Sequence, residues 1–202
     1  MTGPDAIPTP LLDRSLLEAD VIRRGEYAYF VHPLTDGVPP IQPALLAEVG
    51  AALERLMGPR PDLLLTAEAM GIPVATELGR RLGLPVAIAR KRPYGLPGER
   101  LVAAKTGYGA STLHINGVPP GTRVTVVDDV VSTGGTLAAL VEGARAAGID
   151  VLEVLVVLSR GTGLQDLQAR TDVALKALRQ IEVDPRTNRV RLIGPGTRIS
   201  HV

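Results

Sequence analysis

The sequence predicts an open α/β fold, with a mainly parallel sheet flanked by helices. Three observations support this class. Short apolar runs bounded by turn residues recur along the chain, as in strands that are covered on both faces. Segments with a helical spacing of apolar residues separate these runs, and glycines follow them as stop signals. Such alternation, with right-handed crossovers, produces an open parallel sheet.

Composition limits the possible functions. The chain has 202 residues without internal repeats, which fits a single domain over 1–202 with a proper core. A net charge of +1 gives no general attraction to nucleic acid or anionic membrane, so neither is expected as a partner. There are no cysteines, which excludes disulfides and thiolate chemistry. The histidines, His32, His114 and His201, are too scattered for a zinc site.

The chain shows no targeting or membrane signal. Its first ten residues lack the basic start and apolar run of a signal peptide. No stretch approaches the roughly 18 apolar residues of a membrane span. We therefore expect a cytoplasmic protein.

The first 60 residues are expected to form an appended subdomain. They contain a short leading helix, a hairpin-like segment "GEYAYFVHP" (25–33) and a helical segment "QPALLAEVGAALERLMG" (42–58). Most of the aromatic residues of the chain lie in the hairpin-like segment, in polar surroundings rather than in a core strand.

Residues 61–170 are expected to form the α/β core. The predicted strands are the apolar runs 62–66, 85–90, 123–129 and 151–159. The predicted helices have apolar residues on one face, and these are Val74, Leu78 and Leu82 in the first and Leu137, Leu140, Val141 and Ala144 in the second. Gly143, inside the second helix, costs about 1 kcal/mol relative to alanine, which suggests close packing there.

Two further segments depart from this alternation. Residues 91–121 are too long and too rich in glycine and proline for an ordinary connection, and loops of this size are usually lids or binding loops. Residues 171–202 alternate modestly in polarity and predict one or two terminal strands.

The segment "VTVVDDVVSTGGT" (124–136) carries the strongest chemical signal. It passes from a predicted buried strand through Asp128 and Asp129 into a glycine turn that opens a helix. The free N–H groups of a helix start attract an anion, and small residues let the backbone wrap a phosphate. The loop residues in question are Ser132, Thr133, Gly134, Gly135 and Thr136.

The two carboxylates would repel a phosphate and must face something else. Adjacent acids can accept hydrogen bonds from a vicinal diol or hold a hydrated magnesium ion. A ribose 5-phosphate satisfies both halves, with the phosphate on the loop and the 2- and 3-hydroxyls on Asp128 and Asp129. Taken separately, the glycines could form only a tight turn and the two acids only a solvated cap at the strand end. Their occurrence together in one uninterrupted segment favours a ligand site.

These residues resemble a known family. "VVDDVVSTGGT" resembles the phosphoribosyl pyrophosphate motif of type I phosphoribosyltransferases. The resemblance extends over nearly the whole chain towards the archaeal-type hypoxanthine/guanine enzymes, which are related to adenine phosphoribosyltransferases. The segments that carry it are 25–39, 66–79, 89–99, 106–109 and 115–136.

The resemblance implies a fold and a function. The fold is that of type I phosphoribosyltransferases, with an N-terminal hood and a mobile lid. The activity is transfer of the 5-phosphoribosyl group from phosphoribosyl pyrophosphate to hypoxanthine or guanine in purine salvage, with Mg²⁺ carried on the substrate and in contact with Asp128 or Asp129. The resemblance also implies a homodimer. Two alternatives stay open, an adenine phosphoribosyltransferase and a nucleotide-sensing regulator without turnover.

The resemblance assigns the pyrophosphate end of the site to "TAEAMG" and "ARKR". The residues are Glu68, Ala69, Met70, Gly71, Arg90, Lys91 and Arg92. The simpler alternatives are a helix-starting turn for the first segment and a solvated basic cluster for the second. The position of the basic segment after a strand favours the ligand role, because open α/β sheets bind ligands at the carboxyl ends of their strands.

The resemblance further assigns 91–121 to the lid and the aromatic hairpin to the hood. Lys105 and Tyr108 are the lid residues expected to reach the reacting ligand, with Gly95, Gly98, Gly107 and Gly109 as hinges. Tyr27, Tyr29 or Phe30 would stack on the base or, alternatively, pack the hood onto the sheet. His32 is expected to be structural.

Two positions depart from the patterns of relatives. Human-type enzymes for 6-oxopurines carry an aspartate where this chain has Ser132, and adenine enzymes often carry a glutamate where it has Gly107. Each of these acids is a proposed base for the purine nitrogen. Because both acids are absent, the proton of the purine nitrogen would pass to water, to the backbone or to another acid such as Glu68. Their absence also motivates the alternative of a regulator without turnover.

Overall fold

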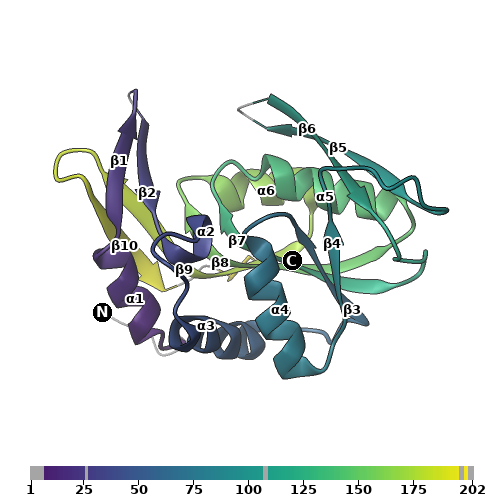
Figure 1. The fold of residues 1–202 in the computed structure, drawn as a ribbon, viewed down its shortest axis with the longest axis horizontal. Helices are drawn as coiled ribbons and strands as arrows, with labels where there is room; N and C mark the ends of the chain where they lie inside the picture. Colours follow the sequence, from purple (N-terminus) through teal and green to yellow (C-terminus); the bar gives the residue numbers. More distant parts are fainter. Residues whose placement is uncertain (1–6, 26, 107–108, 196–197, 200–202) are drawn as a thin grey trace.

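The expected mainly parallel sheet forms the centre of the fold. The computed structural model describes residues 7–25, 27–106, 109–195 and 198–199. Within these residues one sheet has seven strands in the order β10-β9-β8-β7-β3-β4, with β11 paired to β9 (Figure 1). β4, β3, β7, β8 and β9 run parallel, whereas β10 and β11 are antiparallel to β9. The strands are β3 (Leu63–Ala67), β4 (Val86–Ala89), β7 (Arg123–Val131), β8 (Asp150–Arg160), β9 (Ala174–Asp184), β10 (Arg189–Pro195) and β11 (Arg198–Ile199).

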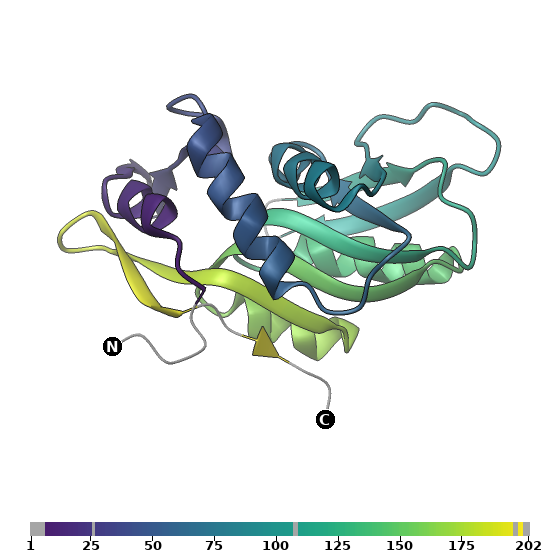
Figure 2. The same ribbon diagram turned by 90° about the horizontal axis from the view of Figure 1, so that it is seen from below.

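Helices cover both faces of this sheet. The edge-on view shows α1, α3 and α4 on one face and α5 and α6 on the other (Figure 2). Their bounds are α1 (Pro10–Leu17), α2 (Pro33–Asp36), α3 (Pro43–Leu56), α4 (Gly71–Leu82), α5 (Gly135–Ala146) and α6 (Gly163–Thr171). Each helix run predicted from apolar spacing is therefore confirmed.

Strand residues divide the interior into two cores. Consecutive side chains of a strand point to opposite faces, so Leu64 packs under α3 and α4 whereas Leu65 packs under α5. Val126 and Val127 of β7 divide in the same way. Burial on both faces explains why these strands have near-continuous apolar sequences.

Gly143 confirms the close packing suspected from the sequence. A Cβ built on it would lie 2.7 Å from Val102 Cγ1 and 3.0 Å from Val102 Cβ. Val102 lies in β5 (Arg100–Thr106), which pairs with β6 (Gly109–Ile115) as an antiparallel hairpin. The glycine therefore lets this hairpin sit directly on α5.

The segment 91–121 contains more regular secondary structure than the loop that the sequence predicts. The middle of the segment is the β5–β6 hairpin, whose residues Val102, Leu113 and Ile115 are buried against α5. Arg90 and His114 exchange two backbone hydrogen bonds of 3.0 and 2.7 Å, which tie the hairpin to the end of β4. Glycine and proline are concentrated in the turns that flank the hairpin. Because they dominate the composition of the segment, its composition indicated a loop rather than strands.

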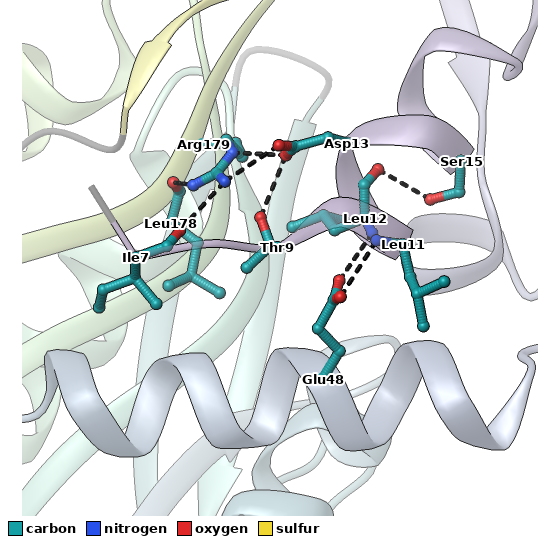
Figure 3. A network of polar contacts seen from close by, with 9 residues as sticks. All are labelled: Ile7, Thr9, Leu11, Leu12, Asp13, Ser15, Glu48, Leu178 and Arg179. Carbon is teal, nitrogen blue, oxygen red and sulfur yellow. Dashed lines mark hydrogen bonds and ion pairs between the residues drawn. The ribbon is translucent and has the colours of Figure 1, made fainter. Parts of the chain in front are cut away.

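The N-terminal region combines the hairpin of β1 (Asp20–Arg24) and β2 (Tyr27–Val31) with α1 and α2. Figure 3 shows how α1 is held. The buried Arg179 of β9 bonds Asp13 through Nε at 2.5 Å and the Ile7 carbonyl through Nη2 at 3.1 Å. Glu48 of α3 accepts from the N–H groups of Leu11 and Leu12, so a neighbouring helix caps α1. The N-terminal region is thus tied to the sheet and to α3.

His32 is structural, as expected. It is fully buried, its Nδ1 accepts from the N–H of Leu34, and its Nε2 lies 2.9 Å from Ser15 Oγ. Because Nδ1 accepts, Nε2 carries the proton and donates to Ser15, whose hydroxyl donates to the Leu12 carbonyl. Burial lowers the pKa of His32 to about 4, against an opposing effect of Asp36.

The C-terminal region contributes more to the sheet than one or two terminal strands. β9 is an interior strand between β8 and β10, and β11 is a third strand that pairs with it. Polar residues in β9 obscured it, because Lys176 pairs with the fully buried Glu153 and Arg179 pairs with Asp13. Among the described helices, none combines the length and apolar character needed to cross a membrane.

Candidate functional site

The carboxyl ends of two neighbouring parallel strands define the candidate site. β3 and β7 pair directly, with Leu63 opposite Val124, so the loops that follow them emerge at the same edge of the sheet. One loop leads into α4 and the other into α5. Between them lies an open cavity of about 150 Å³. It is lined by Ala67, Glu68, Ala69, Asp128, Asp129, Val130, Val131, Ser132, Thr133, Gly134, Gly135, Thr136 and Leu137.

Asp128 and Asp129 lie near the carboxyl end of β7 and are almost fully buried, with 9% and 8% exposure. Asp128 Oδ1 accepts from the N–H of Asp129 at 3.0 Å. Burial raises the pKa of both carboxyls, and the negative charge of Asp128 raises that of Asp129 further. A ligand that donates hydrogen bonds or brings positive charge would therefore stabilise the ionised form of this carboxylate pair.

The loop after β7 offers a helix start to an anion. Gly134 has φ +70° and precedes the first residue of α5, and no side chain caps this end of the helix. Ser132 and Thr133 are exposed, with their hydroxyls available to a ligand. The first-turn N–H groups and the helix dipole both favour an anion here.

Gly163 supports this loop from behind. A Cβ on Gly163 would lie 2.6 Å from the Ser132 carbonyl oxygen and 3.0 Å from that of Val131. The start of α6 therefore packs directly on the backbone of the anion loop. Sequence reasoning had missed Gly163, although its place just after the end of β8 was a usable signal.

The loop after β3 brings Glu68 and Ala69 to the same cavity. The peptide bond between them is cis. Gly71 begins α4 beside Asp128, since a Cβ on Gly71 would lie 2.5 Å from Asp128 Oδ1. Met70 precedes Gly71, is half-buried and stands outside the cavity wall. The segment predicted for the pyrophosphate end thus lies against the predicted ribose acids.

The basic residues after β4 differ in their surroundings. Arg90 pairs through Nε with Glu68 Oε2, and the backbone N–H of Lys91 donates to Glu68 Oε1 at 2.9 Å. The Lys91 N–H and the Arg90 guanidinium lower the pKa of Glu68. Arg92 lies over the ring of Tyr94 at 5.5 Å and is exposed. None of the described residues that line the cavity is an arginine or a lysine.

The lid residues are only partly described. Lys105 lies in β5 opposite Ala110, and its side chain is outside the described part of the structure. Tyr108 and Gly107 lie outside the described residues. Gly95 and Gly98, two of the expected hinges, have φ of +67° and +83°.

Of the hood aromatics, Phe30 packs in the core. Phe30 is 4% exposed and belongs to the core with Leu12, which leaves no face of its ring for a base. Tyr29 is half-buried and its hydroxyl donates to Asp36 Oδ1 at 2.7 Å. The side chain of Tyr27 lies outside the described part of the structure.

Two polar residues that sequence reasoning missed connect the hood to the central sheet. Helix α2, which ends at Asp36, contacts β7, and the negative charge of Asp36 adds to the effects of burial and of Asp128 that raise the pKa of Asp129. Arg160, at the carboxyl end of β8, donates to the carbonyl of Ala28 in β2 at 2.7 Å. The signal for Arg160 was its position at the end of a predicted parallel strand.

No cluster of three or more histidine, cysteine or acidic residues suited to a metal occurs in the described part of the chain. The cavity instead combines an anion-binding helix start with paired buried carboxylates. Such a site suits a ligand with a phosphate at one end and hydroxyl groups further along.

Comparisons with known proteins agree with this geometry. The family model for the phosphoribosyl transferase domain matches residues 41–184. A hypoxanthine/guanine phosphoribosyltransferase of Methanosalsum zhilinae is 46% identical over 170 residues, which cover 84% of this chain and 89% of the relative. One of Methanothrix soehngenii is 45% identical over 185 residues, covering 92% and 96% of the two chains.

A solved structure shows the same fold. The crystal structure of adenine phosphoribosyltransferase from Thermoanaerobacter pseudethanolicus matches with a TM-score of 0.69 and 25% identity, over 84% of this chain and 99% of that one. The matched family segment contains both loops of the cavity and the strands that carry them. The chain therefore belongs to the phosphoribosyl transferase family.

Proposed function

We propose that the protein transfers the 5-phosphoribosyl group from phosphoribosyl pyrophosphate to hypoxanthine or guanine, giving IMP or GMP and pyrophosphate. The single observation that carries this proposal is the cavity in which a buried carboxylate pair adjoins the open start of α5. The names of the relatives at 45–46% identity support the choice of base.

Each part of the donor substrate has a proposed partner. The 5-phosphate binds the N–H groups and hydroxyls of Ser132–Thr136, and Asp128 and Asp129 accept from the ribose hydroxyls. The pyrophosphate lies near the backbone of Ala69, Met70 and Gly71. Arg90 and Lys91 follow the neighbouring strand and supply positive charge to it.

The reaction is a substitution at C1 of the ribose. The C1–oxygen bond to pyrophosphate breaks, a bond from the purine nitrogen to C1 forms, and the nitrogen loses its proton to water. Positive charge develops on the sugar ring in an oxocarbenium-like transition state, so catalysis comes mainly from positioning and electrostatics. Lys105 and Tyr108 belong to the lid that excludes water from this cation.

We propose that magnesium enters with the substrate. When bound, it neutralises charge on the pyrophosphate oxygens. The donor set fits this role because the wall offers Asp128 and Asp129 as hard oxygen donors without a full protein cage, and magnesium usually keeps waters and substrate oxygens as ligands. We further propose that the protein is cytoplasmic and a homodimer, which light scattering of the purified chain would measure.

A panel of bases tests the proposal. The protein is incubated with magnesium, phosphoribosyl pyrophosphate and hypoxanthine, guanine, xanthine or adenine, and released pyrophosphate is measured. We expect turnover with hypoxanthine and guanine. Turnover with adenine alone would establish the adenine alternative, and binding without turnover on any base would establish the regulator.

A paired substitution tests the site within this assay. Asp128→Asn together with Asp129→Asn should leave the fold intact, as measured by circular dichroism, and lower kcat/KM by at least about 100-fold. Unchanged activity would show that these acids do not contact the ribose.

A further inference from the structure

The carboxylate of Glu68 joins the ends of β3 and β4. Its Oε1 accepts from the N–H of Lys91 at 2.9 Å, and its Oε2 pairs with Arg90 Nε. These two donors belong to the strand end that supplies positive charge at the edge of the cavity. The carboxylate of a single side chain thus occupies both donors.

The backbones on either side of this contact are fixed. The N–H of Glu68 donates to the Ala89 carbonyl at 3.0 Å. Arg90 exchanges backbone hydrogen bonds of 3.0 and 2.7 Å with His114. A ligand that approaches the donors therefore meets a side chain that must move, and the strand ends themselves stay in place.

Glu68 is closer to the cavity than its partner Arg90. Glu68 lines the cavity, whereas none of the described lining residues is a cation. The Arg90 side chain is 42% exposed and that of Glu68 is 19% exposed. Ion pairs with this exposure contribute little to stability, so exchange of the partner has a low cost. A phosphate group is a stronger partner for a guanidinium, since it offers more charge and bidentate geometry.

We propose that Glu68 is a positioning residue that occupies the Arg90 guanidinium and the Lys91 N–H in the free enzyme and yields them to pyrophosphate. The inference rests on the proposed function, because it assigns the partner of that site. Glu68 keeps the donors oriented towards the cavity, and its negative charge weakens the hold on pyrophosphate. The product is therefore released faster than from a site with unopposed donors.

The substitution Glu68→Gln tests this role. The amide keeps the size of the side chain and removes the charge that competes with pyrophosphate. We expect magnesium pyrophosphate, titrated alone by calorimetry, to bind about two- to fivefold more tightly, which matches the loss of one exposed ion pair. In the transferase assay, KM for phosphoribosyl pyrophosphate and kcat should both fall, because release of pyrophosphate is slower.

Glu77→Gln is the matched control. Glu77 of α4 accepts from Arg80 Nε at 2.9 Å and also lies 4.0 Å from Arg81 Nη1, and Arg80 is the main cause of its lowered pKa. The substitution therefore removes ion pairs with arginines outside the cavity wall. Its affinity for magnesium pyrophosphate should equal that of the unmodified protein. The Glu68 effect should also shrink when Arg90 is replaced by alanine, since the competing pair is then already broken.

The possible outcomes separate the inference from the proposed function. Weaker binding by Glu68→Gln would mean that the carboxylate itself helps to hold the magnesium complex, and this would overturn the inference. Equal affinity of the variant and the unmodified protein for magnesium pyrophosphate would show that the Glu68–Arg90 contact is an ordinary surface ion pair. That result would overturn the inference as well. In both cases the unmodified protein still binds and turns over its substrates. If the unmodified protein binds neither pyrophosphate nor phosphoribosyl pyrophosphate, both proposals fail.

Discussion

Gly71 and Asp128 are in direct contact across the candidate site. A Cβ on Gly71 would lie 2.5 Å from Asp128 Oδ1 and 3.3 Å from Asp128 Cα, closer than a side chain permits. The start of α4 can therefore approach the first acid of β7 only because it lacks a side chain. This contact sets the position of the loop after β3 relative to the carboxylate pair.

Gly71→Ala is expected to lower kcat/KM by about 100-fold, because a shift of about 1 Å at a reacting centre has an effect of this size. Initial rates with hypoxanthine measure the change, and circular dichroism verifies the fold. Gly194→Ala is the control, since Gly194 has nothing within 4 Å of its Cβ position and no positive φ. Equal rates for the two variants would contradict the role of this contact.

Gly163→Ala should act on the phosphate loop. Its new Cβ would lie 2.6 Å from the Ser132 carbonyl oxygen, which is part of a fixed backbone and must shift. We expect about a tenfold weaker affinity for ribose 5-phosphate, measured by calorimetry, while affinity for magnesium pyrophosphate stays the same. A loss of both affinities to the same extent would indicate general unfolding instead.

Asp129→Asn should stabilise the ligand-free protein and weaken its affinity for ribose 5-phosphate. Burial and Asp128 raise the pKa of Asp129 in the folded state, so ionisation disfavours folding as the pH rises above about 4, the ordinary value for aspartate. At pH 7 we therefore expect the free energy of unfolding to be higher for the variant than for the unmodified protein. Denaturant unfolding at pH 7 and pH 3.5 measures this, and the gain should vanish at the lower pH. A gain that is larger at pH 3.5 would refute the assignment.

His32 should give the opposite pH dependence. Its folded-state pKa is lowered from 6.5 to about 4, so the unfolded chain binds a proton first as the pH falls. Stability is therefore complete above pH 6.5 and decreases by about 3 kcal/mol towards pH 4. Denaturant unfolding of the unmodified protein and of His32→Gln, which cannot titrate, should show this slope only in the former. Parallel pH profiles would exclude His32 as its source.

Local patterns in the sequence predicted the central sheet well. Buried strands such as β7 and β8 have apolar residues on both faces. The acids near the end of β7 and the glycines after it lie at the edge where the cavity forms. By contrast, β9 carries Lys176 and Arg179 at buried positions, where distant acids pair with them. Such partners are 23 and 166 residues away, and no local pattern reveals them.

The remaining parts of the site depend on similar distant contacts. Asp36 is an ordinary turn residue in the sequence, and only the packing of the hood brings it near Asp129. The pairing of Glu68 with Arg90 arises because β3 and β4 are neighbours in the sheet, although helix α4 separates them in the chain. Side-chain partners of this kind follow from the assembled fold rather than from spacing along the chain.

The direct pairing of β3 with β7 fixes the distance between the two loops that line the cavity. Paired parallel strands lie about 4.8 Å apart, and backbone hydrogen bonds fix that interval independently of the side chains. The two loops that begin at these strands are therefore held at a constant separation. The hood, by contrast, is joined to the end of β8 through a side-chain contact, from Arg160 to the Ala28 carbonyl. Under the proposed function, the sugar donor binds at these two loops and the acceptor base binds at the hood. We therefore expect that the choice of base can change while recognition of the sugar donor stays constant.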